Sequence, residues 1–515
     1  MSSSSPYKLS LLEKSGYAMG DAAANLVWRG ALAYLAVFYT DTLGISAAAA
    51  GTLLLLVRLS DGITDIIMGM VADRTHTKYG KFRPWILWSA PVLGLFMVLA
   101  FTAPDVSPMW KLVWAYFTYI GLTLAYTVNN VPYSALMGVM TPSHTERSVL
   151  SGFRFAGAFC GGALVMSFTP EMVAYFGQGN DAVGYQHTMY VFAALLVALC
   201  MVTFFTTRER VAPVVEDNVG SASEMLRSVV LMCIPLGSMS WFFVQRDWFS
   251  GSVFLVIIAM SVIVIRKLIH TPEEQRSPTQ RDIIDLITNG PWLMVLGLGL
   301  FTMFFNGIRY TSVAYYFTYV MGDASLAGKF FFVILVASVV AALVAGYLTE
   351  WLGKKALFSI SLIVSGSLTC CIYLIEPGQV TAIMVLGVAA EFFAAFMPVL
   401  TFSMLGDAAD YSEWRHGRRA TGLFYSAGTF IQKMGGGFAG ALVLLVLAGF
   451  GYVGTDPSTV DQAKGGMIAL MSWIPSLFAF AALGLLVFYP LNTKRMSEIE
   501  GDLISRREQK EDASS

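Results

Sequence analysis

Long apolar runs recur along the chain from Tyr17 to Pro490, and short polar loops separate them. The runs are continuous rather than alternating, which favours membrane-spanning helices over a transmembrane barrel. We predict six spans before the middle of the chain and six after it. The first six cover 16–40, 46–72, 84–104, 111–140, 149–177 and 186–206. The second six cover 291–321, 327–349, 356–375, 379–405, 420–450 and 466–490.

The region between the two halves carries two further apolar runs, 225–244 and 249–269. Each is just long enough to span a bilayer, so we predict an inserted transmembrane hairpin and about fourteen segments in total. One or two interfacial helices remain an alternative, because Pro235 and nearby charges weaken the first run. The predicted all-α chain divides into a six-helix bundle, a central region, a second six-helix bundle and a cytoplasmic tail. These parts cover 1–206, 207–290 with a polar cytoplasmic linker at 271–282, 291–490 and 491–515.

Charge sets the orientation of these spans. The strongly basic loops are 74-RTHTKYGKFR-83, 353-GKK-355 and 415-RHGRR-419. The positive-inside rule places these loops and both chain ends in the cytoplasm. Only 13% of the residues are charged, against about 25% in soluble domains. The net charge of −1 gives no reason to expect a nucleic-acid partner, and the five cysteines lie in apolar runs without metal-ligand spacing.

Three charged residues, Arg58, Asp61 and Asp65, lie inside the second apolar run. Their spacing of i, i+3 and i+7 puts them on one face of a helix. A carboxylate at the bilayer centre costs roughly 2.5–3.5 kcal/mol on insertion scales, so two of them require a compensating ligand. A small cation is the simplest ligand, although a proton shared by close carboxylates would also suffice. A structural ion pair of either acid with Arg58 stays open.

Polar residues also form a stripe along the first span, where Tyr17, Asp21, Asn25 and Arg29 follow one another at steps of four. Such a stripe must line a cavity or pack against polar partners. Other spans supply candidate partners for it. These are Tyr126, Asn129, Asn130, Tyr133, Arg154, Asn306, Arg309, Glu391, Thr429, Gln432 and Lys433.

A weak repeat links the two halves. Gly69-x-x-x-Asp73 precedes one basic loop and Gly346-x-x-x-Glu350 precedes another, as expected of transporters built from two related halves. These residues resemble the major facilitator superfamily. The string 78-KYGKFRPW-85 resembles the signature of its glycoside–pentoside–hexuronide:cation symporter family, which includes melibiose and glucuronide permeases. Further matching pieces are 39-YTD-41, 130-NVPYSAL-136, 153-FRF-155, 315-YYFTYVMGD-323 and 407-DAADYSEW-414.

The resemblance covers nearly the whole chain except 211–280 and implies a central sugar cavity beside a cation site. The family's cation ligands correspond here to Asp61, Asp65 and Thr127. Thr64 stands where the family often has an asparagine, so the choice between Na⁺, H⁺ and Li⁺ stays open. We expect Na⁺ or H⁺ as the coupling ion and no organic cofactor.

The sugar site implied by the resemblance is unusually cationic. Two family acids that hold sugar hydroxyls are replaced by Asn25 and Asn130, and Arg29 and Arg309 have no expected counterpart. Because arginine binds carboxylates through a bidentate fork, we predict an anionic sugar: a uronate, a glucuronide or an oligouronide. Neutralisation of the two arginines by Asp21 and Glu391 would instead favour a neutral glycoside or pentoside. The predicted substrate ligands are Asn25, Arg29, Tyr126, Asn130, Arg154, Asn306, Arg309, Thr429, Gln432 and Lys433.

On the cytoplasmic side we predict ion pairs that close the inner face and exchange as the halves rock. Their members are Asp73, Arg83, Arg147, Asp407 and Asp410. Exposed pairs of this kind stabilise by only ~0–1 kcal/mol, and solvated loop charges are the alternative.

We therefore expect a monomeric secondary symporter in the bacterial inner membrane, working by alternating access on a sugar. A cation-coupled lipid transporter and a sugar sensor are the alternatives from other classes. The sequence contains no phosphate-binding loop and no nucleophile–base constellation, so neither ATP-driven pumping nor an enzyme is predicted.

Overall fold

The computed structural model is helical, and its elements follow the predicted spans closely. It describes residues 8–30, 34–35, 38–45, 47–211, 234, 238, 248–272, 275–323, 325–376, 378–417, 421–452 and 457–514. The side chains of Arg58 and Asp61 lie outside this description, so what the sequence predicts for them stays a prediction.

The first half contains six spans in seven helical elements. They are α1 (Leu11–Gly30), η2 (Phe38–Thr42), α2 (Ala47–Asp73), α3 (Arg83–Ala100), α4 (Pro108–Met140), α5 (His144–Gly177) and α6 (Asp181–Thr206). Local chemistry fixes several starts. Pro84 and Pro108 occupy the first turns of α3 and α4, where the missing N–H costs nothing. The side chain of Ser143 caps α5 by accepting a hydrogen bond from the Glu146 amide.

The second half repeats this arrangement. Its elements are α10 (Gly290–Tyr315), η4 (Tyr316–Val320), α11 (Ser325–Leu352), α12 (Lys354–Cys371), η5 (Ile372–Leu374), α13 (Val380–Ala394), α14 (Phe396–His416), α15 (Thr421–Gly449), η6 (Pro457–Thr459), α16 (Val460–Met471) and α17 (Trp473–Val487). The tenth span is broken between α13 and α14 at Ala395. Pro398 follows the break and cannot donate to the carbonyl of Ala394, which explains the interruption.

Three of the described helices lie outside the two bundles: α8 (Trp248–His270), α9 (Pro278–Ile287) and α18 (Thr493–Ser514). Helix α8 covers the second predicted hairpin run. The first run, 225–244, lies almost entirely outside the described residues, so the hairpin and the count of fourteen segments remain predictions. Helix α9 begins inside the predicted linker, where Ser277 and Gln280 form a capping box.

Membrane-crossing length is widespread in the described part of the chain. Nine of its helical stretches are long and apolar enough to cross a bilayer. The pattern is that of a multi-pass membrane protein.

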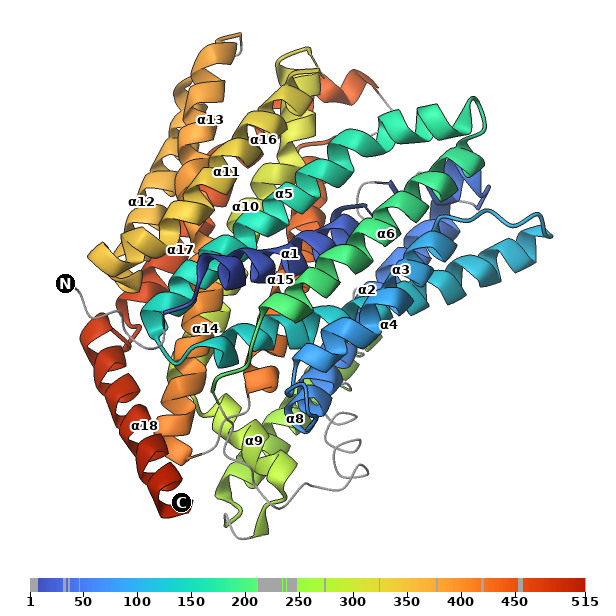
Figure 1. Cartoon of the computed structure of the whole chain (residues 1–515). Helices are drawn as coiled ribbons and strands as arrows, with labels where there is room; N and C mark the ends of the chain where they lie inside the picture. Colours follow the sequence, from blue (N-terminus) through green and yellow to red (C-terminus); the bar gives the residue numbers. More distant parts are fainter. Residues whose placement is uncertain are drawn as a thin grey trace.

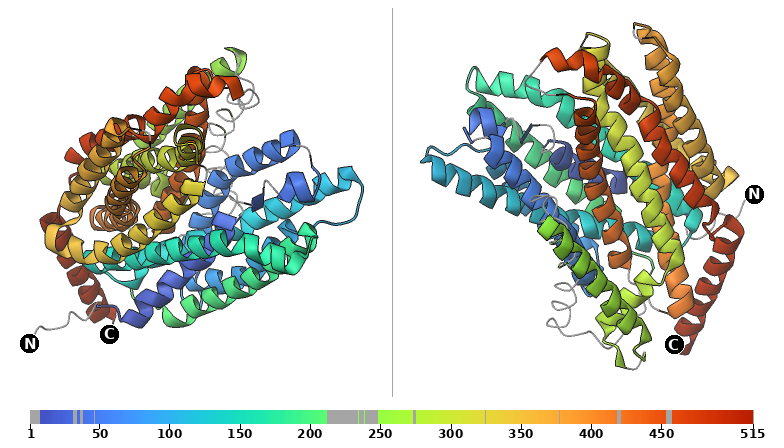
Figure 2. Two further views of the ribbon diagram at one scale, coloured as in Figure 1. Left: turned by 90° about the horizontal axis from the view of Figure 1, so that it is seen from above. Right: turned by 180° about the vertical axis from the view of Figure 1, so that it is seen from behind.

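The two halves cross tightly at one end and diverge toward the other. In Figure 1, α3–α6 extend to the right while α11–α13 extend upward, and Figure 2 (left) shows the halves side by side. A Cβ placed on Gly69 would lie 2.8 Å from the carbonyl oxygen of Gly422, and one on Gly346 would lie 2.4 Å from the Cα of Val149. Both glycines of the sequence repeat therefore permit close crossings, α2 with α15 and α5 with α11.

Candidate transport site

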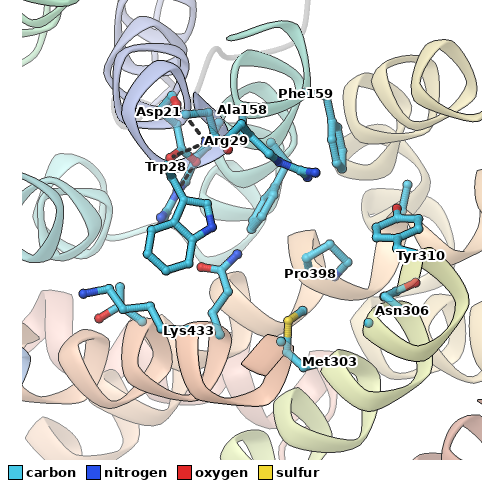
Figure 3. A pocket seen from close by; sticks show the side chains of 18 of the residues that line it. Asp21, Trp28, Arg29, Ala158, Phe159, Met303, Asn306, Tyr310, Pro398 and Lys433 are labelled. Carbon is cyan, nitrogen blue, oxygen red and sulfur yellow. Dashed lines mark hydrogen bonds and ion pairs between the residues drawn. The ribbon is translucent and has the colours of Figure 1, made fainter. Parts of the chain in front are cut away.

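A cavity of about 230 Å³ lies between the two halves. Residues of α1, α4 and α5 line it on one side, and residues of α10, α13, α14 and α15 line it on the other. Figure 3 shows Asp21, Trp28 and Arg29 of α1 opposite Asn306 and Tyr310 of α10. Nine of the ten predicted substrate ligands line this cavity: Asn25, Arg29, Tyr126, Asn130, Arg154, Asn306, Thr429, Gln432 and Lys433.

The polar stripe of α1 reaches the cavity because α1 and α5 approach each other closely. A Cβ on Gly157 would lie 2.2 Å from the carbonyl oxygen of Ala18, and one on Gly161 would lie 2.3 Å from that of Ala22. These two glycines are spaced i and i+4, the small-residue pattern of packed membrane helices. The spacing Gly157-x-x-x-Gly161 is a signal in the sequence that could have predicted this contact.

Arg154 of α5 is compensated by Asp21 of α1. Its Nε donates to Asp21 Oδ2 at 2.9 Å, and its Nη2 donates to the Ser134 hydroxyl at 3.0 Å. The guanidinium also lies 4.3 Å from the ring centroid of Phe402. Its Nη1 is buried and has no hydrogen-bond partner among the described residues. The pair therefore leaves one donor available beside the cavity.

Lys433 of α15 lies at the predicted cation site rather than only at the sugar site. Its ammonium is 2.7 Å from Asp65 Oδ1 and 3.3 Å from the Thr127 hydroxyl. Thr127 itself donates to Asp65 Oδ1 at 2.9 Å, and Thr429 donates to Oδ2 at 3.5 Å. Asp65 is completely buried. Carboxylate and hydroxyl oxygens here form a set suited to a hard cation, and in this structure the lysine supplies the positive charge.

Thr64 precedes Asp65 on α2, and its side chain is partly buried. Its role as a cation ligand stays a prediction from the sequence.

Arg309 is the predicted ligand that does not line the cavity. Its Nη1 donates to Glu391 Oε2 at 3.1 Å, while the hydroxyls of Tyr310 and Ser338 donate to Oε1 at 2.5 and 2.9 Å. Arg309 is 3% exposed and Glu391 is 1% exposed, so this is a buried, saturated pair. The alternative that Glu391 neutralises Arg309 describes this part of the site. Asp21, by contrast, neutralises Arg154 and not Arg29.

Arg29 is the remaining cation of the cavity. Its Cγ would lie 3.2 Å from a Cβ on Gly162, so that glycine makes room for the side chain. Each acid at the site is paired with another cation, and no described residue forms an ion pair with Arg29. Among the described side chains the site therefore has one positive charge in excess. The cations are Arg29, Arg154, Arg309 and Lys433, and the acids are Asp21, Asp65 and Glu391.

A buried network joins the halves at the predicted cytoplasmic side. Arg147 of α5 forms an ion pair with Asp407 at 3.1 Å and a second one with Asp410, both on α14. Lys354, which the sequence analysis did not select, lies 2.5 Å from Asp407. The expectation of weak, exposed pairs is wrong for this group, because Arg147 and Asp407 have almost no exposed surface. Removing one partner of a buried pair is costly, whereas exchange between pairs is not.

Among the described residues, no ion pair joins Asp73 or Arg83 to the other half, contrary to what the sequence suggested. Asp73 accepts hydrogen bonds from the amides of Gly422 and Leu423, at the start of α15, at 2.9 and 3.0 Å. It thus contacts the other half through a helix N-terminus, where a negative charge is favourable. Arg83 donates to the Phe204 carbonyl at 2.7 Å, within its own half.

Comparison with known proteins places this geometry in context. The family described as MFS/sugar transport protein matches residues 16–233 and 225–493. The isoprimeverose transporter of Lactiplantibacillus pentosus is 29% identical over 509 residues, which span 97% of this chain and 91% of the relative. The glucuronide carrier protein homolog of Escherichia coli is 27% identical over 514 residues, which span 96% and 95%.

Solved structures agree on the fold. The proton:xylose symporter XylE bound to 6-bromo-6-deoxy-D-glucose superposes with a TM-score of 0.58 at 15% identity, covering 95% of this chain and 97% of that one. At this level of identity the likeness concerns the fold alone.

Proposed function

This chain belongs to the family of MFS sugar transport proteins, and we propose that it couples inward movement of Na⁺ or H⁺ to uptake of an anionic sugar. The proposed cargo is a uronate, a glucuronide or an oligouronide. The observation that carries the proposal is Arg29, a cavity-lining guanidinium without an acidic partner among the described residues. An unpaired cation at membrane depth is costly, and a substrate carboxylate would compensate it through two parallel hydrogen bonds.

The coupling site follows from the Asp65 cluster. A cation that binds Asp65 Oδ1 and the Thr127 hydroxyl would displace the Lys433 ammonium, which contacts the same two oxygens. Lys433 also lines the sugar cavity, and its Nζ lies 5.3 Å from the ring centroid of Tyr126. Displacement of the ammonium would move a positive charge from the cation site toward the cargo. Asp61 as a second ligand remains a prediction from the sequence.

Alternating access is supported by the closed network of Arg147, Asp407 and Lys354. The halves contact one another there and diverge at the opposite end (Figure 1). If the basic loops face the cytoplasm, as the sequence predicts, this geometry is that of a state closed toward the cytoplasm. Rocking of the halves would separate α5 from α14 and open the inner side.

A neutral glycoside or pentoside is the second candidate. The Arg309–Glu391 pair favours it, since one of the two unexpected arginines is already neutralised. The isoprimeverose transporter shows by its name that a relative of similar identity handles an uncharged sugar.

Uptake into proteoliposomes separates the two candidates. The cargo panel pairs p-nitrophenyl glucuronide with p-nitrophenyl glucoside, each with and without an inward Na⁺ or pH gradient. We expect gradient-driven uptake of the glucuronide that falls at least tenfold in Arg29→Gln, which removes a charge-assisted bond worth roughly 1.5–3 kcal/mol. Lys464→Gln is the matched control, because it removes the same charge from an exposed Lys464–Asp461 pair away from the cavity. The anionic cargo would be refuted if Arg29→Gln took up the glucuronide as fast as the wild type, or if the wild type took up the glucoside alone.

A further inference from the structure

The two walls of the cavity carry opposite hydrogen-bonding character. The wall formed by α1 and α5 presents donors: the Arg29 guanidinium and the unpartnered Nη1 of Arg154. The wall formed by α10 and α13 presents Asn306, Tyr310 and Glu391. Figure 3 shows Arg29 and the pair Asn306 and Tyr310 on opposite sides.

Asn306 supplies the most direct evidence on the second wall. The residue is only 9% exposed, and its buried Oδ1 has no hydrogen-bond partner among the described residues. A buried acceptor without a partner costs about 1–3 kcal/mol in general, so its persistence beside a cavity indicates that a ligand completes it. Because a carbonyl oxygen can only accept, the ligand group must be a donor.

Tyr310 and Glu391 extend the same acceptor surface. The Tyr310 hydroxyl donates its proton to Glu391 Oε1, so its oxygen can only accept a hydrogen bond from a ligand. Glu391 Oε1 also accepts from Ser338, and Oε2 accepts from Arg309. Glu391 thereby fixes the orientation of Tyr310.

We propose that the cavity binds its cargo with one polarity, the anionic group against Arg29 and sugar hydroxyls against Asn306 and Tyr310. Glu391 acts in this arrangement as a positioning residue that holds the Tyr310 hydroxyl as an acceptor. The inference rests on the proposed function for the anionic group. The hydroxyl side of it stands on Asn306 and Tyr310 alone.

A ligand-and-variant cycle tests the polarity in the purified full-length protein. The probes are p-nitrophenyl glucuronide, its monodeoxy analogues and its uronamide, with binding measured by calorimetry. Asn306→Ala should weaken the parent about tenfold, the effect of losing one hydrogen bond to a buried acceptor. The monodeoxy analogue that lacks the hydroxyl bound by Asn306 should bind to the wild type and to Asn306→Ala with the same affinity. Arg29→Gln should not change the affinity for the uronamide, whereas Asn306→Ala should weaken binding of the uronamide about as much as it weakens binding of the parent.

Two additional variants protect the test from a folding artefact. Asn306→Asp retains an acceptor and should keep the preference between the parent and that deoxy analogue, while its added charge weakens every anionic probe. Thr302→Ala lies one turn earlier on α10, where the buried hydroxyl donates to the Gly299 carbonyl, and should leave the deoxy series unchanged.

The outcomes are distinct. If Asn306→Ala weakens binding of every monodeoxy analogue as much as it weakens binding of the parent, Asn306 contacts none of the hydroxyls and the proposed polarity is wrong. The polarity is also wrong if Asn306→Ala no longer weakens binding of the uronamide, because Asn306 then contacts the carboxylate. If the wild-type protein binds no glucuronide, the anionic cargo fails. The monodeoxy series is then built on p-nitrophenyl glucoside, and additive losses with Asn306→Ala would overturn the hydroxyl assignment as well.

Discussion

Replacing Lys433 with alanine should tighten binding of the coupling cation. The ammonium occupies the position that a cation needs, 2.7 Å from Asp65 Oδ1 and 3.3 Å from the Thr127 hydroxyl. A charge-assisted hydrogen bond contributes about 1.5–3 kcal/mol, so removing the competitor should lower the Kd for Na⁺ by roughly tenfold or more. In the absence of cation the variant should be destabilised by about 3–5 kcal/mol, because Asp65 is left buried and unpaired.

Thermal unfolding in detergent measures both effects. A ligand that binds only the folded state stabilises it by RT ln(1 + [L]/Kd), so the melting temperature is recorded against NaCl concentration with choline chloride as the salt control. Lys433→Ala should melt below the wild type without Na⁺ and regain most of the difference with Na⁺. Lys433→Arg keeps the competing charge and should show no such gain. If the coupling ion is H⁺, the same recovery should follow decreasing pH. A variant that shows unchanged or weaker binding of both Na⁺ and H⁺ would refute the competition.

Other consequences concern the contacts between the halves and helix α18. Arg147→Gln should remove the ion pairs of Arg147 with Asp407 and Asp410 and open the inner side, seen as faster labelling of a cysteine placed at Ser148; unchanged labelling would exclude a gating role. Gly69→Ala should have the same effect through its clash with the Gly422 carbonyl, whereas Gly440→Ala, with open space around it, should not. Glu500→Gln should weaken the 2.6 Å contact with His144 of α5 and speed amide exchange in α18, while the exposed Glu498→Gln should not; equal exchange in both variants would show that this contact does not hold α18 against α5.

Much of the fold could be predicted from the sequence, because membrane spans are recognisable as long, continuous apolar runs. Most of the six-plus-six spans follow the observed helices within about six residues, but α1 ends at Gly30 and α14 continues to His416, well past the predicted end at 405. Gly69 and Gly346 marked both crossings between halves. The break beside Pro398 is likewise expected from the missing amide proton. The region 225–244 stays a prediction, because it falls almost entirely outside the described part of the chain.

The charges of the site were harder to assign because periodicity gives the face of a helix but not the neighbour that meets it. Arg29 and Arg309 look equivalent in the sequence, yet only Arg309 meets Glu391. Lys433 was expected beside the sugar and lies against Asp65, because α15 crosses both α2 and α4. The net charge of the cavity depends on these pairings. The positive excess expected from the sequence is therefore larger than the one excess charge found among the described side chains.

The central claim is that Arg29 selects an anionic sugar, and a binding ratio tests it most directly. Calorimetry on the purified protein gives the Kd of p-nitrophenyl glucuronide relative to that of p-nitrophenyl glucoside, in the wild type and in Arg29→Gln. We expect the wild type to prefer the glucuronide and the variant to lose at least tenfold of that preference, with little change in glucoside binding. A preference that is unchanged in Arg29→Gln, or a wild type that prefers the glucoside, would contradict the account.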